Sequence, residues 1–279
     1  MTALRVLLNP NGHLAAARQL VDVLSRHRQL TWEFTKRELQ ERYAGQMLGT
    51  VWTLGHPLLL MALYVFVFGY VFRIRIAGEA SGADYAAYLL AGLIPWLAFQ
   101  ESMTKGTTVI VQSAGLVKQV VFPVEILPVK GVLASIFTEL VCFAVLLVYV
   151  VWRDAFSWMW LLLPALLAVQ ALAMIGTCYV LASVGVFIRD VKDLVVVFTV
   201  AGLYLMPTLY APGTIPAGLE VFFWFNPFSH MVWCFQDVIY FRRIAHPAAW
   251  LAFPLLSAAV FYLGFRVFQK LRPMFGNAL

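Results

Sequence analysis

Long apolar stretches, separated by short polar or charged segments, dominate the chain from residue 51 onward. With their flanking residues, six of them are long enough to cross a bilayer, for which an α-helix needs about 20 mostly apolar residues. The fourth is longer than one span requires, which predicts a tilted helix, a kink at Pro164 or a first turn at the interface. We predict an all-α integral membrane protein with six transmembrane helices. They cover residues 51–72, 85–100, 132–152, 156–188, 194–210 and 248–265.

The residues before the first span are more charged, and their apolar positions recur with a helical period. Residues 13–30 fit an amphipathic helix, and residues 31–47 fit a second helix that is too charged to cross the membrane. A charged amphipathic helix directly before a span usually lies in the interface. No secretory signal is expected, because the apolar run 4–8 is short and contains Arg5. Residues 1–50 are therefore predicted to be cytoplasmic and interfacial.

The segment between the fifth and sixth spans is apolar but irregular. Residues 212–247 contain four prolines, and the apolar stretch 221–240 is interrupted by Asn226-Pro227. Irregular backbone at membrane depth is tolerated only where protein or water covers it. We therefore interpret residues 212–240 as a re-entrant pair of short helices that enters from the outer side, rather than as a seventh span.

The distribution of Lys and Arg predicts which side each connection faces. With six spans and a cytoplasmic N-terminus, 15 of the 20 basic residues lie inside, as the positive-inside rule requires, and both termini are cytoplasmic. Seven spans place 14 inside, so the broken segment 221–240, and not charge, decides for six. The predicted layout is a cytoplasmic and interfacial part (1–50), a transmembrane domain (51–270) and a cytoplasmic tail (271–279).

Composition excludes most soluble functions. Hydrophobic residues make up 62% of the 279 positions and charged residues 12%, whereas soluble chains have about 45–50% and about 25%. The net charge of +6 comes from basic residues that flank the spans, which indicates membrane topology and lipid headgroups rather than nucleic acid. The three cysteines form no CxxC pair and the five histidines no HExxH, so no metal site is predicted.

The sequence also lacks enzymatic motifs. It contains no Gly-Lys pair, and hence no Walker A loop, and no GxSxG. Glu139 is the one acid near the centre of a predicted span. It is either a proton or cation site, or a neutral or hydrogen-bonded side chain between helices. Without a second central charge, the latter interpretation is favoured.

Two further features are candidates for function. The cytoplasmic loop 113–128 combines charged and apolar side chains with Pro123 and Pro128, which restrict its geometry, so it is either a docking element or a loop on the membrane surface. Aromatic residues are frequent in the first, second and fifth spans, where they either form interface belts or line a pathway. Aromatic faces suit the flat C–H surfaces of sugar rings.

The order of several short motifs resembles the permeases of bacterial polysaccharide ABC exporters of the ABC-2 type, which serve O-antigen, capsule and teichoic acid export. The resemblance covers about residues 30–272. One position departs from the family pattern: the family often has a neutral or acidic polar residue where this chain has His56. The motifs are Arg42-Tyr43, Leu48-Gly49, Trp52, Pro57, Val67-Phe68-Gly69, Phe122-Pro123, Arg189-Asp190 and Asn226-Pro227.

The resemblance implies a transport subunit, not an enzyme, in the bacterial cytoplasmic membrane. It implies a second copy of the chain and two copies of a separate subunit that carries ATP and Mg, with no cofactor in this chain, and a lipid-linked glycan as substrate. ATPase coupling would fall to Leu116, Lys118, Phe122, Pro123 and Glu125, and an interfacial gate helix would include Arg37, Glu41, Arg42 and Tyr43. Channel-lining candidates are Trp52, Tyr64, Phe68, Trp96, Phe99, Phe198 and Tyr204.

Two alternatives stay open. One is an ABC exporter of a drug or small lipid, since the shared motifs concern coupling more than substrate. The other is an ion-coupled secondary transporter, which would be expected to carry paired intramembrane charges or inverted repeats. A membrane-embedded glycosyltransferase is a further alternative, but the sequence contains no acidic catalytic or metal-binding cluster to support it.

Overall fold

Every regular element that the structure describes is a helix. The computed structural model describes residue 22 and residues 25–41, 51–72, 83–119, 122–153, 156–210 and 217–279. The elements are α3 (Arg28–Glu41), α4 (Trp52–Tyr64) with its π-helical continuation η2 (Val65–Val71), α5 (Ala83–Gly106), α6 (Val109–Gln112), α7 (Ala114–Gln119), α8 (Ile126–Trp152), the 3₁₀ turn η3 (Trp158–Leu162), α9 (Leu163–Phe187), α10 (Val191–Tyr204), α11 (Ala217–Phe225), α12 (Pro227–Gln236), η4 (Asp237–Phe241), α13 (Pro247–Leu271), η5 (Arg272–Met274) and α14 (Phe275–Ala278).

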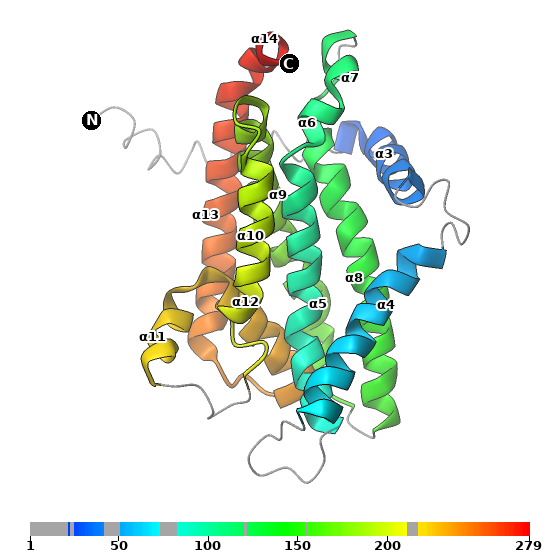
Figure 1. The fold of residues 1–279 in the computed structure, drawn as a ribbon, viewed down its shortest axis with the longest axis vertical. Coiled ribbons are helices and arrows are strands. Elements are labelled where there is room, and N and C mark those ends of the chain that lie inside the picture. The colour runs from blue at the N-terminus through cyan, green and yellow to red at the C-terminus, as the bar shows by residue number, and fades with distance from the viewer. Residues whose placement is uncertain are drawn as a thin grey trace.

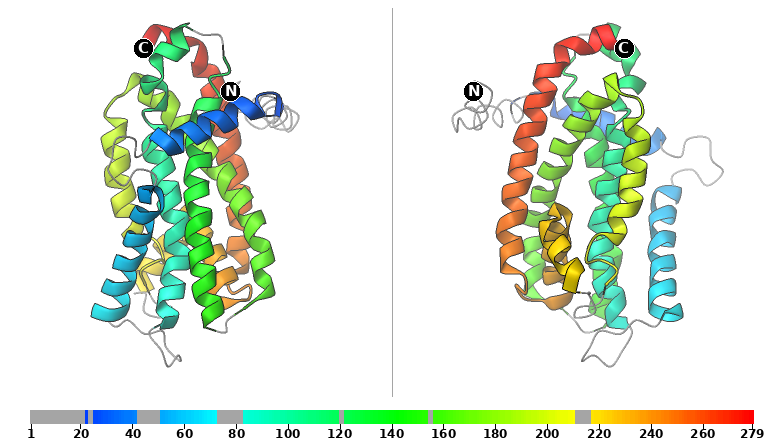
Figure 2. Two further views of the ribbon diagram at one scale, coloured as in Figure 1. Left: turned by 90° about the vertical axis from the view of Figure 1, so that its right-hand side faces the viewer. Right: turned by 60° about the vertical axis from the view of Figure 1, so that its left-hand side comes forward.

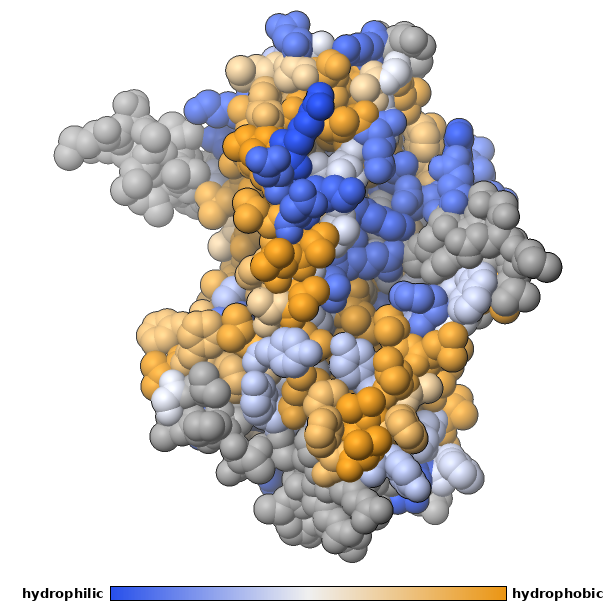
Figure 3. Space-filling model, viewed as in Figure 1, coloured by the Kyte–Doolittle hydropathy of each residue, from blue (hydrophilic) through white to orange (hydrophobic). Residues whose placement is uncertain are grey.

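The long helices α4, α5, α8, α9, α10 and α13 stand side by side as an upright bundle (Figures 1 and 2). Helix α3 lies across one end of the bundle, where α6, α7 and α14 also gather, and α11 and α12 lie at the opposite end (Figure 1). On the face of Figure 3, strongly hydrophilic residues gather in the half that carries α3 and α7. The charged helix and the charged loop of the sequence therefore share one end of the molecule.

Three helices are long and apolar enough to cross a membrane: Ile126–Trp152, Trp158–Phe187 and Pro247–Ala278. They coincide with the third, fourth and sixth predicted spans. The other predicted spans are helical where described, as α4 with η2, α5 and α10, but α10 has only 14 residues and the last turns of α5 carry Glu101 and Lys105. The total of six spans stays a prediction.

Several boundaries differ from the predictions for local reasons. The fourth segment begins with the 3₁₀ turn η3, and Pro164 falls in the first turn of α9, where its missing N–H costs least. Helix α8 already begins at Ile126, so Pro128 lies in its first turn and the predicted loop 113–128 is shorter than expected. Part of that loop is helical, as α7.

The predicted pair of short helices before the last span is confirmed. Asn226 separates α11 from α12: its Oδ1 accepts a hydrogen bond from the Phe228 amide (3.0 Å) and its Nδ2 donates one to the Leu205 carbonyl (2.7 Å). Pro227 then occupies the first turn of α12.

The buried acid Asp237 stabilises the turn between η4 and α13. Asp237 is 0% exposed, and its Oδ2 accepts hydrogen bonds from the backbone amides of Ala245 and His246 (3.0 Å each) and from Trp250 Nε1 (2.9 Å). Its Oδ1 lies 2.7 Å from Nδ1 of His246, whose ring stacks on Trp233 with centroids 5.3 Å apart. One side chain thus fixes the path from η4 into α13.

A close backbone approach joins α9 to α13. A Cβ placed on Gly264 would lie 2.0 Å from the Gly176 carbonyl oxygen, and one on Gly176 would lie 2.4 Å from the Phe261 Cα. Such small residues let two helices pack backbone to backbone. Nearby, the Tyr179 ring packs against Phe268 with centroids 4.8 Å apart.

We predict that Gly264→Ala destabilises the protein by about 3 kcal/mol, because overpacking against a backbone atom has no side-chain relaxation available. The measurement is the melting temperature of the purified chain, followed by size-exclusion chromatography after heating. Gly276→Ala is the matched control, since a Cβ there meets nothing within 4 Å. Equal melting temperatures for the two variants would contradict the tight crossing.

Candidate coupling and transport site

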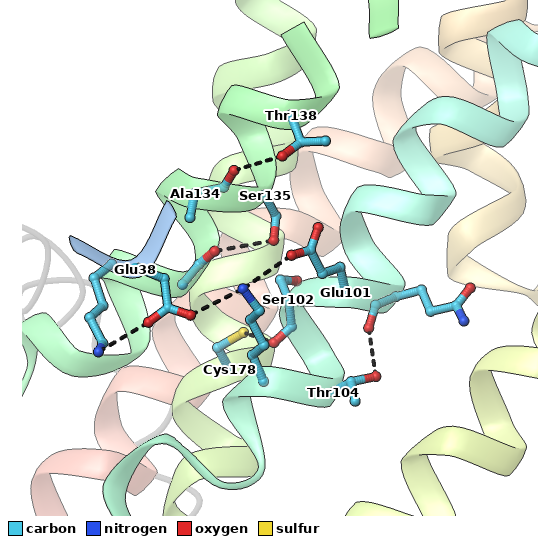
Figure 4. Close-up of polar contacts among 12 residues, drawn as sticks. Glu38, Glu101, Ser102, Thr104, Ala134, Ser135, Thr138 and Cys178 are labelled. Atoms are coloured by element: carbon cyan, nitrogen blue, oxygen red, sulfur yellow. Dashed lines mark hydrogen bonds and ion pairs between the residues drawn. The ribbon is translucent and has the colours of Figure 1, made fainter. Parts of the chain in front are cut away.

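A cluster of four charged residues ties α3 to the bundle. Glu38 of α3 accepts from Lys105 Nζ of α5 at 3.0 Å and from Lys130 Nζ of α8 at 3.1 Å (Figure 4). Glu101, one turn before Lys105, pairs with it at 3.2 Å. Charge-assisted contacts of this kind are stronger than neutral hydrogen bonds. The cluster therefore fixes α3 across the end of two core helices.

The inner face of α3 is formed by residues three and four positions apart. Thr31 and Thr35 are buried, and each hydroxyl is satisfied by donating to a carbonyl one turn earlier in the helix, at 3.0 and 2.8 Å. Phe34 lies on the same side, 6.4 Å from the ring of Phe122 and 5.9 Å from Lys130 Nζ. Glu38 continues this face, so α3 contacts both the bundle and the loop before α8.

Burial and charge act on Glu38 in opposite directions. Partial burial raises the pKa of its carboxyl, but the charges and hydrogen bonds of Lys105 and Lys130 outweigh burial, so the net pKa lies below that of a free glutamate. Glu38 is therefore ionised at neutral pH, and its attachment to the two lysines weakens only in acid.

A cavity of about 750 Å³ lies beside this cluster, between α3, α5, the α6–α7 segment and α8. Lys105, Lys130 and Glu38 contribute to its wall. Apolar and small residues complete the lining, among them Phe34, Leu116, Gly115 and Gly131. The cavity is thus a mixed polar and apolar space at the end of the bundle where the hydrophilic residues gather.

Glu125 directly precedes α8 and contacts residues of α9 and of the end of α13, so it connects three helices. Its carboxylate is paired with Arg272, at the end of α13, and its carbonyl oxygen accepts a hydrogen bond from the Tyr179 hydroxyl of α9 at 3.1 Å. Glu125 is 4% exposed, whereas the Arg272 side chain is 45% exposed. The loop before α8 is therefore tied by direct contacts to α8, α9 and α13.

Residues 29–240, well over half of the chain, match the family described as ABC-2 type transporter. The chain belongs to the ABC-2 type transporter family.

Curated relatives of this family member cover almost its whole length. It is 25% identical over 248 residues to an O-antigen export system permease protein of Klebsiella pneumoniae, with 88% of this chain and 93% of that protein covered. It is 26% identical over 267 residues to the protein of the same name from Myxococcus xanthus, with 94% and 99% covered. A second Klebsiella pneumoniae permease of that name is 26% identical over 249 residues.

The structure places the predicted coupling residues of this ABC-2 transporter at one end, but in different environments. Lys118 is exposed, and Leu116, Phe122 and Pro123 are half-buried. Glu125 is buried, and its carboxylate is turned inward to Arg272, so it positions the loop rather than presenting a charge to a partner. Sequence reasoning did not identify Arg272, because nothing local relates positions 125 and 272.

The predicted gate residues need a similar refinement. Arg37 and Glu41 pair with each other at 2.6 Å on the exposed face of α3, and Arg42 and Tyr43 lie outside the described residues. The α3 residue that pairs with α5 and α8 is Glu38, which is not among the predicted gate residues. Its spacing of three and four from Thr35 and Phe34 was the available sequence signal.

The channel-lining candidates separate into two groups. Trp96 and Phe99 are 0% and 2% exposed and pack edge-on against Phe228 in the core, with centroids 5.3 and 5.1 Å apart. Phe198 and Tyr204 are about half exposed on α10. Trp52, Tyr64 and Phe68 are partly exposed on α4 and η2.

We predict that Glu38→Gln loosens α3, because two lysines lose their shared charged partner. A partly exposed ion pair contributes about 1 kcal/mol, which corresponds to about fivefold in the open population. The measurement is maleimide labelling of a cysteine at the buried position Thr35, with Glu33→Gln on the exposed face as control.

Lowering the pH should have the same effect as Glu38→Gln. Because the folded-state pKa of Glu38 is depressed, its contribution is complete above pH 4.5 and is lost as the pH falls through the folded pKa. Labelling at position 35, taken relative to an exposed cysteine at the same pH, that is unchanged by the substitution and by acid would contradict the role of the cluster.

Proposed function

We propose that this chain is the permease subunit of an ATP-driven exporter that moves a lipid-linked polysaccharide of the O-antigen type across the bacterial cytoplasmic membrane. The observation that carries the proposal is the similarity, over 88–94% of the chain, to permease proteins named for O-antigen export. Membership of the ABC-2 transporter family agrees with it.

In this proposal ATP and Mg²⁺ bind to a separate subunit, and two copies of that subunit serve two copies of this chain. The docking element is the surface formed by α7 and the loop before α8, with Leu116, Lys118, Phe122 and Pro123 facing the partner. Glu125 lies behind it and connects it to α8, α9 and α13. Nucleotide-driven movement of the partner would then tilt three helices together.

The proposed topology has six spans, with α3, α7 and both termini on the cytoplasmic side and the α11–α12 pair on the outer side. The glycan passes between two copies, along the faces of α4 and α10. Tyr64, Phe68, Phe198 and Tyr204 suit that role, since aromatic faces pack on sugar rings without fixing one position along the chain.

The test is co-purification of the chain with the ATPase encoded beside it, followed by ATP hydrolysis in nanodiscs with and without lipid-linked O-antigen. We expect a stable complex whose hydrolysis rises with the glycan, and loss of surface O-antigen when the gene is deleted. A chain that forms no complex, or a deletion strain with normal surface glycan, would overturn the proposal.

We predict that Arg272→Gln uncouples hydrolysis from export. Losing a charged hydrogen bond to a buried carboxylate costs about 2 kcal/mol at a half-exposed site, so the junction becomes flexible while the docking surface persists. ATP hydrolysis by the complex should be retained and glycan export should fall about tenfold, whereas Lys270→Gln, an exposed change two residues away, should have no effect. Parallel loss of hydrolysis and export would place Arg272 in docking instead.

A further inference from the structure

A second cavity, of about 410 Å³, lies between α4, α5 and α8, on the other side of the charged cluster from the 750 Å³ cavity. Its volume is within the range of about 300–1,000 Å³ typical of small-molecule sites. His56 and the Glu101–Lys105 pair belong to its lining, as do Glu139 and Cys142. The apolar part of the lining comes from α4 and α5 and includes Pro57, Leu60, Met61, Ile94 and Leu97.

The α8 wall of this cavity is polar. Ser135, Thr138 and Glu139 are three and four positions apart, which places them on one face of the helix, and all three are buried (Figure 4 shows Ser135 and Thr138). The Ser135 hydroxyl donates to the Gly131 carbonyl at 3.1 Å. What Ser135 offers to the cavity is therefore an acceptor oxygen.

Glu139 carries the main unsatisfied group. Gln170 of α9 donates to its Oε2 at 3.1 Å and also to the Pro95 carbonyl of α5 at 3.2 Å, which fixes the carboxyl from behind. Oε1 is buried and has no hydrogen-bond partner among the described residues. A buried polar atom without a partner costs about 1–3 kcal/mol, so a ligand that supplies one gains that amount.

The chemistry of the site selects a hydroxyl group. A hydroxyl both donates and accepts, so it satisfies Oε1 whether or not the carboxyl carries a proton, and it can donate to Ser135 Oγ as well. An ammonium group would suit only the ionised carboxylate. The opposite wall is apolar and would accept a hydrocarbon segment. The matching ligand is an amphiphile with a hydroxyl-bearing headgroup.

We propose that this cavity binds the sugar headgroup of a glycolipid, with Glu139 as the hydrogen-bond partner of a sugar hydroxyl. The site itself does not depend on the proposed export function. Only the identity of the natural ligand, the lipid-linked glycan, rests on that function.

Cys142 provides a native reporter, because it lines the cavity, whereas Cys178 and Cys234 are buried elsewhere. The experiment measures N-ethylmaleimide modification of Cys142 by peptide mass spectrometry, with the full chain in nanodiscs and without any ATPase. Octyl glucoside below its micellar concentration is the probe, and an octyl dimethylamine oxide, which has the same chain and no hydroxyl, is the control.

We expect octyl glucoside at four times its Kd to slow modification of Cys142 about fivefold by mass action, while the amine oxide has little effect. Glu139→Gln should keep the protection, since an amide oxygen still pairs with a hydroxyl, and Glu139→Ala should lose it. If Glu139→Ala fails to fold, two other variants test the site. Ser135→Ala should reduce the protection by octyl glucoside, and Leu97→Trp, whose larger side chain fills the cavity, should abolish binding of octyl glucoside.

Three results would overturn the proposal. Equal protection by both amphiphiles means an apolar slot without headgroup recognition, and unchanged protection in Glu139→Ala or Ser135→Ala means binding elsewhere. A Cys142 that maleimide never reaches means a cavity closed to any amphiphile. Because no transport is measured, these results are independent of the export and hydrolysis tests.

Discussion

Burying an acidic side chain beside lipid is costly unless the chain supplies its partners, and this constraint organises the molecule. Glu38, Glu125 and Asp237 each pair with a basic or donor group from another part of the chain. Glu139 is held by Gln170. Each pairing fixes two or more helices relative to one another: α3 to α5 and α8, the loop before α8 to α13, η4 to the start of α13, and α8 to α9 and α5.

The same pairings divide the bundle into more and less firmly held parts. Helices α5, α8, α9 and α13 are joined by buried polar contacts and by the backbone crossing at Gly176 and Gly264. By contrast, α4 exposes Leu59 and Leu63 on its outer side, and α10 exposes Leu194 and Val197. Elements with few buried contacts open at lower free energy. The proposed pathway follows the faces of these two less buried helices.

Sequence reasoning located the elements but not their partners. Runs of apolar residues, Asn226-Pro227 and the charged helix before the first span are local signals, and the structure has helices or a helix break at each. Pairing across 67 residues, as for Glu38 and Lys105, or across 147, as for Glu125 and Arg272, leaves no local pattern. Helices that are apolar all round also carry no periodicity to assign their faces. For that reason Trp96 and Tyr204 looked alike in the sequence, although one is in the core and the other is exposed.

Lys105 belongs to the walls of both cavities. The cluster that holds α3 is therefore also the partition between the space under α3 and the space that contains Glu139. Its carboxylates come from two elements, Glu38 from α3 and Glu101 from α5, so a movement of α3 would change the charge balance in the wall of the inner cavity. Since α3 also contacts the loop before α8 through Phe34 and Phe122, displacement of that loop reaches both α3 and the three helices joined at Glu125. A single movement at the proposed docking surface would thus act on the partition and on the bundle together, as the proposed drive by a separate subunit requires.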